Sequence, residues 1–224
     1  MTSRWEAEKR NIVETARSVA KLGLTVGSNG NVSVRLANEG SGDLLAITRS
    51  GARSGDLGPN DVAVVDFDVE SVEPGPTPSS EALLHVAIYR ARPDVGAVIH
   101  THPVFATVAA VAGHEIPSVV DEVAVVVGGA IRVAEYAFPS TQELADNVCE
   151  ALGDRTAALI RSHGAVGVGH DLTEALDVCQ LTERAATIFV YASLLGKVPP
   201  LPADVLKAEE SIYKMRRQAN RGIR

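Results

Sequence analysis

Two histidines, His100 and His102, stand two residues apart at the end of the apolar stretch 95–99. In a β-strand the side chains of residues i and i+2 project from the same face, so the two imidazoles would lie side by side. Many such pairs have only a structural role, but His163 follows a second apolar stretch at a tight turn and offers a third nitrogen. Three nitrogens with an open position form the donor set of a catalytic zinc site.

A fourth candidate group lies in the segment "PTPSSEALLH", where Glu81 begins a predicted helix over residues 81–92. The hydroxyls and amides of Ser79 and Ser80 stand where an anion binds at the positive end of a helix. In the simpler interpretation, Ser80 caps the helix and Glu81 complements its dipole. Both interpretations stay open at this point. His85, one turn further on, is expected to orient Glu81, whereas the remaining histidines, His114 and His170, are assigned to loops.

Two glycine-rich segments have the composition of phosphate-binding loops. The first, "VGSNGNVSVR", supplies Ser28, Asn29, Gly30 and Asn31, and the second, "TRSGARSG", supplies Ser50 and Gly51. Successive backbone amides in such loops bind anions. Neither segment matches a Walker loop or a dinucleotide fingerprint, and each alone is also compatible with an ordinary turn.

The elements that must position these residues follow from periodicity and from turn residues. A helix is predicted over 12–20, closed by Gly23, and the stretch 157–169 reads as strand, turn, strand. Asp171 and Glu174 form a capping box at the start of a long helix that ends near residue 195. Further strands are predicted over 31–36 and 44–49 as a hairpin, over 61–67 and over 95–102, with a short helix over 103–113. This alternation predicts a sheet covered by helices.

The composition excludes several classes of partner. The 224 residues carry a net charge of −7, which argues against a general nucleic-acid or anionic-membrane surface, so any anionic ligand must be held locally. Cys149 and Cys179 fall in predicted helices without CxxC spacing, and we expect both to be reduced. Because neither a signal-peptide pattern nor a run of about 18 apolar residues occurs, we expect a cytoplasmic protein without a membrane partner.

Taken together, these segments resemble the class II aldolase and adducin family, in particular its sugar-phosphate aldolases and 4-epimerases, fuculose-phosphate aldolase among them. The resemblance covers roughly residues 10–195, through "GLTVGSNGNVSVR", "TRSG", "PSSEALLHVAIYRARPDVGAVIHTHP", "AEYAFPSTQELADNV" and "LIRSHGAVGVGHDLTEAL". It implies an α/β fold with three α/β/α layers and a mixed, mostly antiparallel central sheet. It further implies one domain over residues 1–224, with a basic C-terminal tail from about 207, and a homotetramer with active sites at subunit interfaces.

The resemblance also implies roles for individual residues. The histidines matching His100, His102 and His163 bind one Zn²⁺ per subunit, and the glutamate matching Glu81 is both a further ligand and an acid/base. The loops matching Ser28, Gly30, Asn31, Ser50, Gly51, Ser79 and Ser80 bind the substrate phosphate. The implied reaction is retro-aldol cleavage of a phosphorylated sugar, a ketose 1-phosphate similar to L-fuculose 1-phosphate, to dihydroxyacetone phosphate and an aldehyde.

Other activities are compatible with the same resemblance. The family also includes 4-epimerases, 3-oxo-tetronate 4-phosphate decarboxylases and methylthioribulose-1-phosphate dehydratases. Adducin-type proteins use the same domain as a non-catalytic interaction module, but they lack the metal ligands, which are all present here.

One segment departs from the pattern of the fuculose-type aldolases. Those enzymes carry a tyrosine after "IP" that reaches a neighbouring subunit's site, whereas this chain has "IPSVVDEVAVVVGG". Asp121 and Glu122 are the residues at the matching positions, and we expect one of them to replace the tyrosine as the acid/base, unless both are solvated turn residues. Tyr213 is the nearest match to a C-terminal family tyrosine. It stands in the basic tail, which could close over an anionic substrate or lie in solvent.

Overall fold

The predicted hairpin is present in the computed structural model as the antiparallel strands β1 (Asn31–Leu36) and β2 (Leu44–Thr48), which belong to a seven-stranded sheet. The structure describes residues 4–37 and 42–221. Residues 38–41 of the predicted connection lie outside the described ranges. The other strands are β3 (Val62–Asp66), β4 (Ala97–Thr101), β5 (Arg132–Ala134), β6 (Ala157–Ile160) and β7 (Gly164–Gly169). The order across the sheet is β3-β2-β1-β4-β7-β6-β5. Only the β5–β6 pair is parallel among these described strands, so the expected mixed, mostly antiparallel sheet is confirmed.

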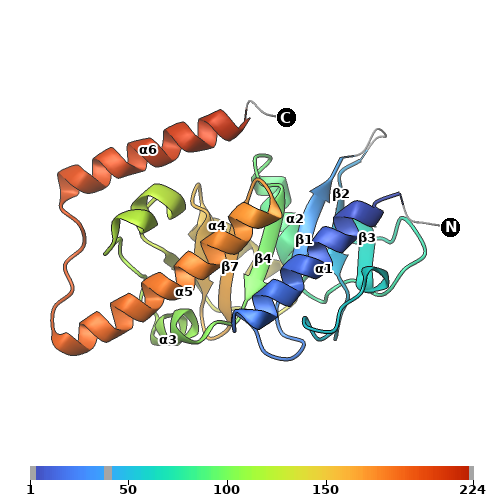
Figure 1. Ribbon diagram of the computed structural model, residues 1–224, viewed down its shortest axis with the longest axis horizontal. Helices are drawn as coiled ribbons and strands as arrows, with labels where there is room; N and C mark the ends of the chain where they lie inside the picture. Colours follow the sequence, from blue (N-terminus) through green and yellow to red (C-terminus); the bar gives the residue numbers. More distant parts are fainter. Residues whose placement is uncertain (1–3, 38–41, 222–224) are drawn as a thin grey trace.

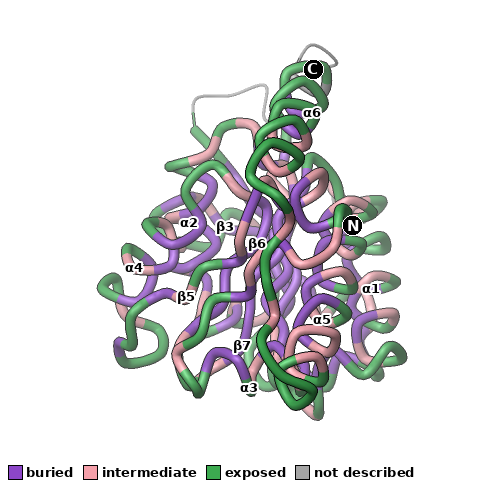
Figure 2. Tube along the Cα trace, turned by 90° about the vertical axis from the view of Figure 1, so that its left-hand side faces the viewer, coloured by how far each residue is buried: buried purple, intermediate pink, exposed green. Residues whose placement is uncertain are grey.

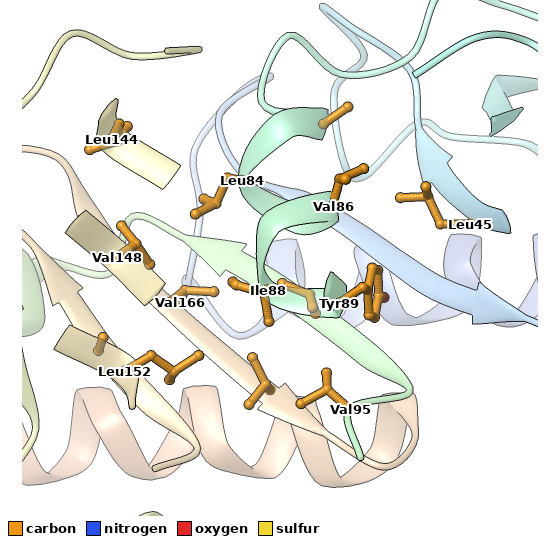
Figure 3. Close-up of a cluster of buried hydrophobic side chains, with 14 of the residues drawn as sticks. Leu45, Leu84, Val86, Ile88, Tyr89, Val95, Leu144, Val148, Leu152 and Val166 are labelled. Carbon is orange, nitrogen blue, oxygen red and sulfur yellow. The ribbon is translucent and has the colours of Figure 1, made fainter. Parts of the chain in front are cut away.

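Helices cover both faces of this sheet and make the three expected layers (Figure 2). One face carries α1 (Glu6–Lys21), α3 (Val104–Ala112) and α5 (Leu172–Leu195), and the other carries α2 (Ala82–Ala91) and α4 (Gln142–Leu152). Figure 3 shows how α2 and α4 pack on the sheet, where Ile88 and Val148 lie near Val166 of β7 in one buried cluster. The central strands are therefore held from both sides, which fixes the residues at their ends. Cys149 and Cys179 are free thiols in α4 and α5, as expected.

The segment predicted as a basic tail from about residue 207 is instead part of helix α6 (Ala203–Arg221), which runs along one end of the molecule (Figure 1). Helix α6 packs against η2 (Val123–Val127), a one-turn π-helix. Tyr213 and Arg217 are buried, and Arg217 forms an ion pair with Asp94, whose carboxylate also binds Arg92 at 2.8 Å. Burial opposes the charge of Asp94, but these two arginines hold its pKa well below the usual range. The tail is therefore docked on the fold through Tyr213 and Arg217, although most of its other described side chains are exposed.

No helix within the described residues is long and apolar enough to span a membrane.

Glu183 of α5 caps the start of α3, the helix that directly follows the histidine pair. Its carboxylate accepts hydrogen bonds from the backbone amides of Phe105 (2.9 Å) and Ala106 (2.8 Å) in the first turn of α3. We expect Glu183→Ala to lower the free energy of unfolding by about 1–3 kcal/mol, because two helix-start amides lose a charged acceptor. Denaturant unfolding measures this loss. Glu14→Ala, at an exposed site on α1, serves as the control, and equal stability of the two variants would contradict the capping role.

Candidate active site

The end of β4 and the β6–β7 turn bring the three predicted ligands to the same edge of the sheet. Strands β4 and β7 are antiparallel neighbours with Thr101 opposite Ala165, so His163, just before β7, reaches the position of His102, just after β4. The backbone amide of His102 donates to the Leu24 carbonyl at 2.9 Å, which anchors the chain there. The sequence prediction placed both histidines in a strand, and the structure ends that strand one residue before His102.

A glycine after His163 is needed for this approach of the two chain segments. A Cβ atom on Gly164 would lie 2.3 Å from the carbonyl oxygen of Thr101, closer than atoms in real structures come. The residue before His163, Ser162, has the left-handed φ of 55°. The turn is therefore shaped to place the His163 ring against the end of β4.

The three imidazoles converge on one point. The Nε2 atoms of His100 and His102 are 2.9 Å apart, and the ring centroids of all three histidines lie 4.7 to 4.9 Å from one another. The Nδ1 atom of buried His100 is 2.9 Å from the Ala165 carbonyl, which can only accept, so Nδ1 carries the proton and Nε2 faces the cluster as a lone pair. Burial, followed by the neighbouring rings of His100 and His163, lowers the pKa of His102 to about 3. Neutral imidazoles of this kind are the metal-binding form.

Glu81 completes the cluster from the start of α2. Its Oε2 atom lies 3.3 Å from His100 Nε2, and its Oε1 atom lies 3.4 Å from His163 Nε2. Burial raises the pKa of this carboxyl, but the rings of His100 and His163 outweigh burial and leave the pKa below its usual value. Oε1 is buried and has no hydrogen-bond partner among the described residues. Three imidazole nitrogens and a carboxylate oxygen left without a partner fit a divalent metal ion.

Asn31 connects Glu81 to a buried chain of hydrogen bonds. Its side-chain amide donates to Glu81 Oε2 at 3.0 Å, while its carbonyl accepts from Nε2 of His85, a buried ring whose pKa burial lowers to about 3. His85 Nδ1 then accepts a hydrogen bond from the Ser33 hydroxyl at 2.7 Å. The Ser33 hydroxyl also forms a hydrogen bond with the Tyr89 hydroxyl at 2.8 Å. The expectation that His85 orients Glu81 is thus met indirectly, through Asn31. Asn31 itself lies at the site, but both ends of its amide have protein partners.

A cavity of about 180 Å³ opens beside the cluster, and all seven residues predicted to bind phosphate line it. Glu81, His102 and His163 line the same cavity, so the structure places the two predicted sites next to each other. A larger groove of about 960 Å³ lies between α1 and the start of α5. It includes Gly96, at the opposite end of β4 from His102, and none of the predicted site residues. The smaller cavity is therefore the candidate active site.

Backbone contacts hold the loops of this cavity in place. The amide of Ser50 donates to the Thr77 carbonyl at 3.1 Å, and the amide of Ser79 donates to the Thr48 carbonyl at 3.0 Å. Gly30 has a φ of 78°, and a Cβ there would lie 2.7 Å from the carbonyl oxygen of His100, which only glycine allows. The capping interpretation of Ser80 is wrong, because Glu81 is the N-cap residue of α2. The backbone amide of Glu81 donates a hydrogen bond to the Ser79 hydroxyl at 3.2 Å. Ser80 stays exposed to the cavity.

The sequence analysis missed three cavity residues, Arg49, Pro139 and Ser140. Arg49 stands directly before the predicted loop residue Ser50. Pro139 and Ser140 precede α4 in the segment "PSTQ", which repeats the pattern of "PSSE" before α2. That repeated pattern was the available signal for a second helix start at the cavity.

The candidate residues Asp121 and Glu122 do not line this cavity. Both are exposed in the helical turn before η2, facing Glu209 of α6, whose pKa is raised by its partial burial and by these two carboxylates. Tyr213 does not line the cavity either. Its ring packs on Gly128, and its hydroxyl donates to the Asp154 carbonyl, so its polar group already has a partner inside the chain. Within one subunit, the acid/base expected from this region is therefore absent from the cavity residues that the structure describes.

Comparison with known proteins agrees with this arrangement. The family model described as "Class II Aldolase and Adducin N-terminal domain" matches residues 10–190. A 5-methylthioribulose-1-phosphate/5-deoxyribulose-1-phosphate aldolase of Rhodospirillum rubrum is 38% identical over 201 residues, 90% of this chain and 88% of the relative. L-fuculose phosphate aldolase of Escherichia coli K12 is 33% identical and covers 96% of this chain and 95% of its own. A solved L-fuculose 1-phosphate aldolase matches with a TM-score of 0.87 at 32% identity, covering 96% and 98% of the two chains. The chain belongs to the class II aldolase and adducin family.

Proposed function

We propose that the protein is a zinc-dependent aldolase that cleaves a ketose 1-phosphate to dihydroxyacetone phosphate and an aldehyde. The observation that carries this proposal is the convergence of His100, His102, His163 and Glu81 beside a cavity lined by the phosphate-loop residues. The relatives named as aldolases of fuculose phosphate and of 5-deoxyribulose 1-phosphate support the same reaction class. Adducin-like binding without catalysis would not require this set of converging metal ligands.

The zinc ion would be held by the three imidazole nitrogens and Glu81. When bound, it supplies the positive charge that stabilises the ketone oxygen as the electron pair of the breaking carbon–carbon bond moves onto it. Cleavage removes the proton from the hydroxyl that becomes the aldehyde oxygen, and the dihydroxyacetone carbon then takes up a proton. Glu81, which Asn31 orients, handles the proton at that carbon.

We propose that the proton at the aldehyde oxygen is handled by Asp121 or Glu122 of a neighbouring subunit in a homotetramer. Support comes from exposed apolar side chains on α3, the helix that directly follows His102, and at the end of α5. Val104 and Val111, on one face of the helix that follows His102, are 65% and 62% exposed, and Leu195 at the end of α5 is 92% exposed. The rings of Phe105 on α3 and Tyr191 on α5 pack together, with their centroids 5.3 Å apart. Large apolar side chains left exposed on adjoining helices favour a protein–protein contact.

Product analysis tests the reaction type. Purified zinc-loaded protein is incubated with L-fuculose 1-phosphate, 5-deoxyribulose 1-phosphate, methylthioribulose 1-phosphate and a 3-oxo-tetronate 4-phosphate. We expect dihydroxyacetone phosphate, detected through NADH-coupled reduction, from at least one of the ketose 1-phosphates. An epimer, a dehydrated product or CO₂ in its place would assign the chain to another activity on the same site.

Ser80→Ala should raise KM for the ketose 1-phosphate more than it lowers kcat, because a phosphate contact binds ground and transition states alike. Inorganic phosphate should compete with the substrate in the wild-type enzyme. Steady-state kinetics of this variant and of Ser18→Ala, a serine on α1 that does not line the cavity, measure the difference. Equal cleavage of the unphosphorylated ketose would contradict a phosphate site here.

A further inference from the structure

The cavity needs a positive group for the phosphate of its proposed substrate, and Arg49 is the residue with a permanent positive charge among the described residues that line it. The residues that the sequence predicted to bind phosphate are serines, glycines and an asparagine, none of them charged. Glu81 adds a negative charge to the same cavity. The chain as a whole carries a net charge of −7. Long-range attraction therefore does not favour a phosphate dianion, and the attraction must come from a group at the site.

The contacts of Arg49 hold its guanidinium in a fixed place. Nε donates to Asp61 Oδ1 at 2.5 Å, and Nη1 donates to the Ser50 carbonyl at 3.2 Å, at the loop predicted to bind phosphate. Asp61 is held in place in turn, because its Oδ2 atom accepts a hydrogen bond from the Gly58 amide at 2.9 Å. The backbone amide of Arg49 also donates to the Asp61 carbonyl at 2.9 Å. The side chain is therefore anchored through two of its three guanidinium nitrogens.

The third guanidinium nitrogen, Nη2, carries the free donors. Nη2 makes no hydrogen bond to any residue in the described part of the chain, and the Arg49 side chain is 41% exposed. The ion pair with Asp61 adds little to the free energy of unfolding, because half-exposed pairs contribute about 0–1 kcal/mol. Stability alone therefore does not explain why an arginine stands here. A pre-oriented guanidinium with a free nitrogen is suited to bind a phosphate through charge-assisted hydrogen bonds.

From this arrangement we propose that Arg49 binds the phosphate of the substrate through its free Nη2, with Asp61 as the residue that positions it. The proposal rests on the ketose 1-phosphate activity proposed above and adds a cationic contact to the neutral loops. It predicts that this chain distinguishes dianionic phosphate esters from neutral sugars largely through Arg49. Lysine cannot replace it fully, because a single ammonium cannot hold Asp61 and also present a planar pair of donors.

Arg49→Met tests the proposal, since methionine keeps an unbranched apolar stem but removes the charge and every donor. We expect inorganic phosphate, titrated calorimetrically into metal-loaded protein, to bind at least about tenfold more weakly to this variant than to the wild type. Arg49→Lys should give an intermediate affinity. The matched control is Arg53→Met, which removes the same charge from an exposed pair with Asp56 in the same loop, outside the cavity, and should leave phosphate affinity unchanged.

Kinetics separate this proposal from the proposed function. If Arg49 binds phosphate, Arg49→Met loses kcat/KM on a ketose 1-phosphate by at least about tenfold, mainly through KM, and keeps its metal content. A purely structural role would lower the thermal midpoint and leave phosphate affinity unchanged, which would overturn the proposal. Arg49→Lys provides the same comparison if the methionine variant does not fold. Failure of the proposed function would appear differently, as a wild-type protein that cleaves none of the ketose 1-phosphates.

Discussion

Replacement of His102 by alanine is expected to abolish both metal binding and cleavage. The ring supplies one of three nitrogens that converge at one point, and beyond His163 and Glu81 the described residues that line the cavity include no His, Cys, Asp or Glu that could replace it. Elemental analysis of the purified variant should show the metal content falling from one per chain to near zero. Activity should fall with it, by at least about four orders of magnitude, if the ion supplies the main charge stabilisation.

The matched control for this variant is His114→Ala. His114 is exposed in the loop after α3, so its loss should leave metal content and activity unchanged. Stoichiometric metal in His102→Ala would show that the ion is bound elsewhere. Circular dichroism of both variants verifies that the fold is retained.

Either Asp121→Asn or Glu122→Gln, but not both, is expected to lower aldol cleavage by at least about a hundredfold while metal content stays intact. Positioned proton transfer contributes about a hundred- to ten-thousand-fold, and these two residues are the ionisable groups that the sequence resemblance matches to the tyrosine of the fuculose-type aldolases. Both are exposed and lie outside the cavity of their own subunit, as a group that serves a neighbouring subunit must be. Steady-state cleavage rates measure the effect, with Glu115→Gln, an exposed residue before this segment, as the control.

Mixed oligomers test whether that carboxylate acts across subunits. The affected variant is unfolded and refolded together with Glu81→Gln, so that some interfaces combine an intact Glu81 with an intact carboxylate. Activity should rise in the mixture above the activity of either variant alone. Wild-type rates in both single carboxylate variants would end the two-subunit mechanism for this chain. Tyr213 would then be a poor replacement, because its hydroxyl is bonded to the Asp154 carbonyl.

The sequence predicted the parts of the fold whose signals are local. Strands β1, β2, β4, β6 and β7 alternate or run apolar, and the helix before Gly23 ends as its C-terminal glycine predicts. The metal ligands were predictable for the same reason, since two of them flank one strand end and the third stands before the glycine that the turn requires. Their convergence followed from the antiparallel pairing of β4 and β7.

Features that depend on distant contacts were not predictable. The valine-rich run Val123–Val127 has the composition of a strand, but packing against α6 holds it as a π-helix. The three residues of β5 are too few to show a period. Arg49 was missed because its place in the cavity depends on Asp61, twelve positions further along the chain. The hydrogen bonds that join Asn31 to Glu81 and His85 were not predictable either, because these partners lie 50 and 54 positions away in the sequence.

Titration of metal-free protein with zinc, with dihydroxyacetone phosphate formation measured at each step, tests the central claim most directly. The account predicts that the cleavage rate of a ketose 1-phosphate rises in proportion to added zinc and stops rising at one ion per chain. The His102→Ala variant should show no such rise. Full activity in the metal-free protein, or a fully loaded protein that forms no dihydroxyacetone phosphate from any ketose 1-phosphate, would contradict it.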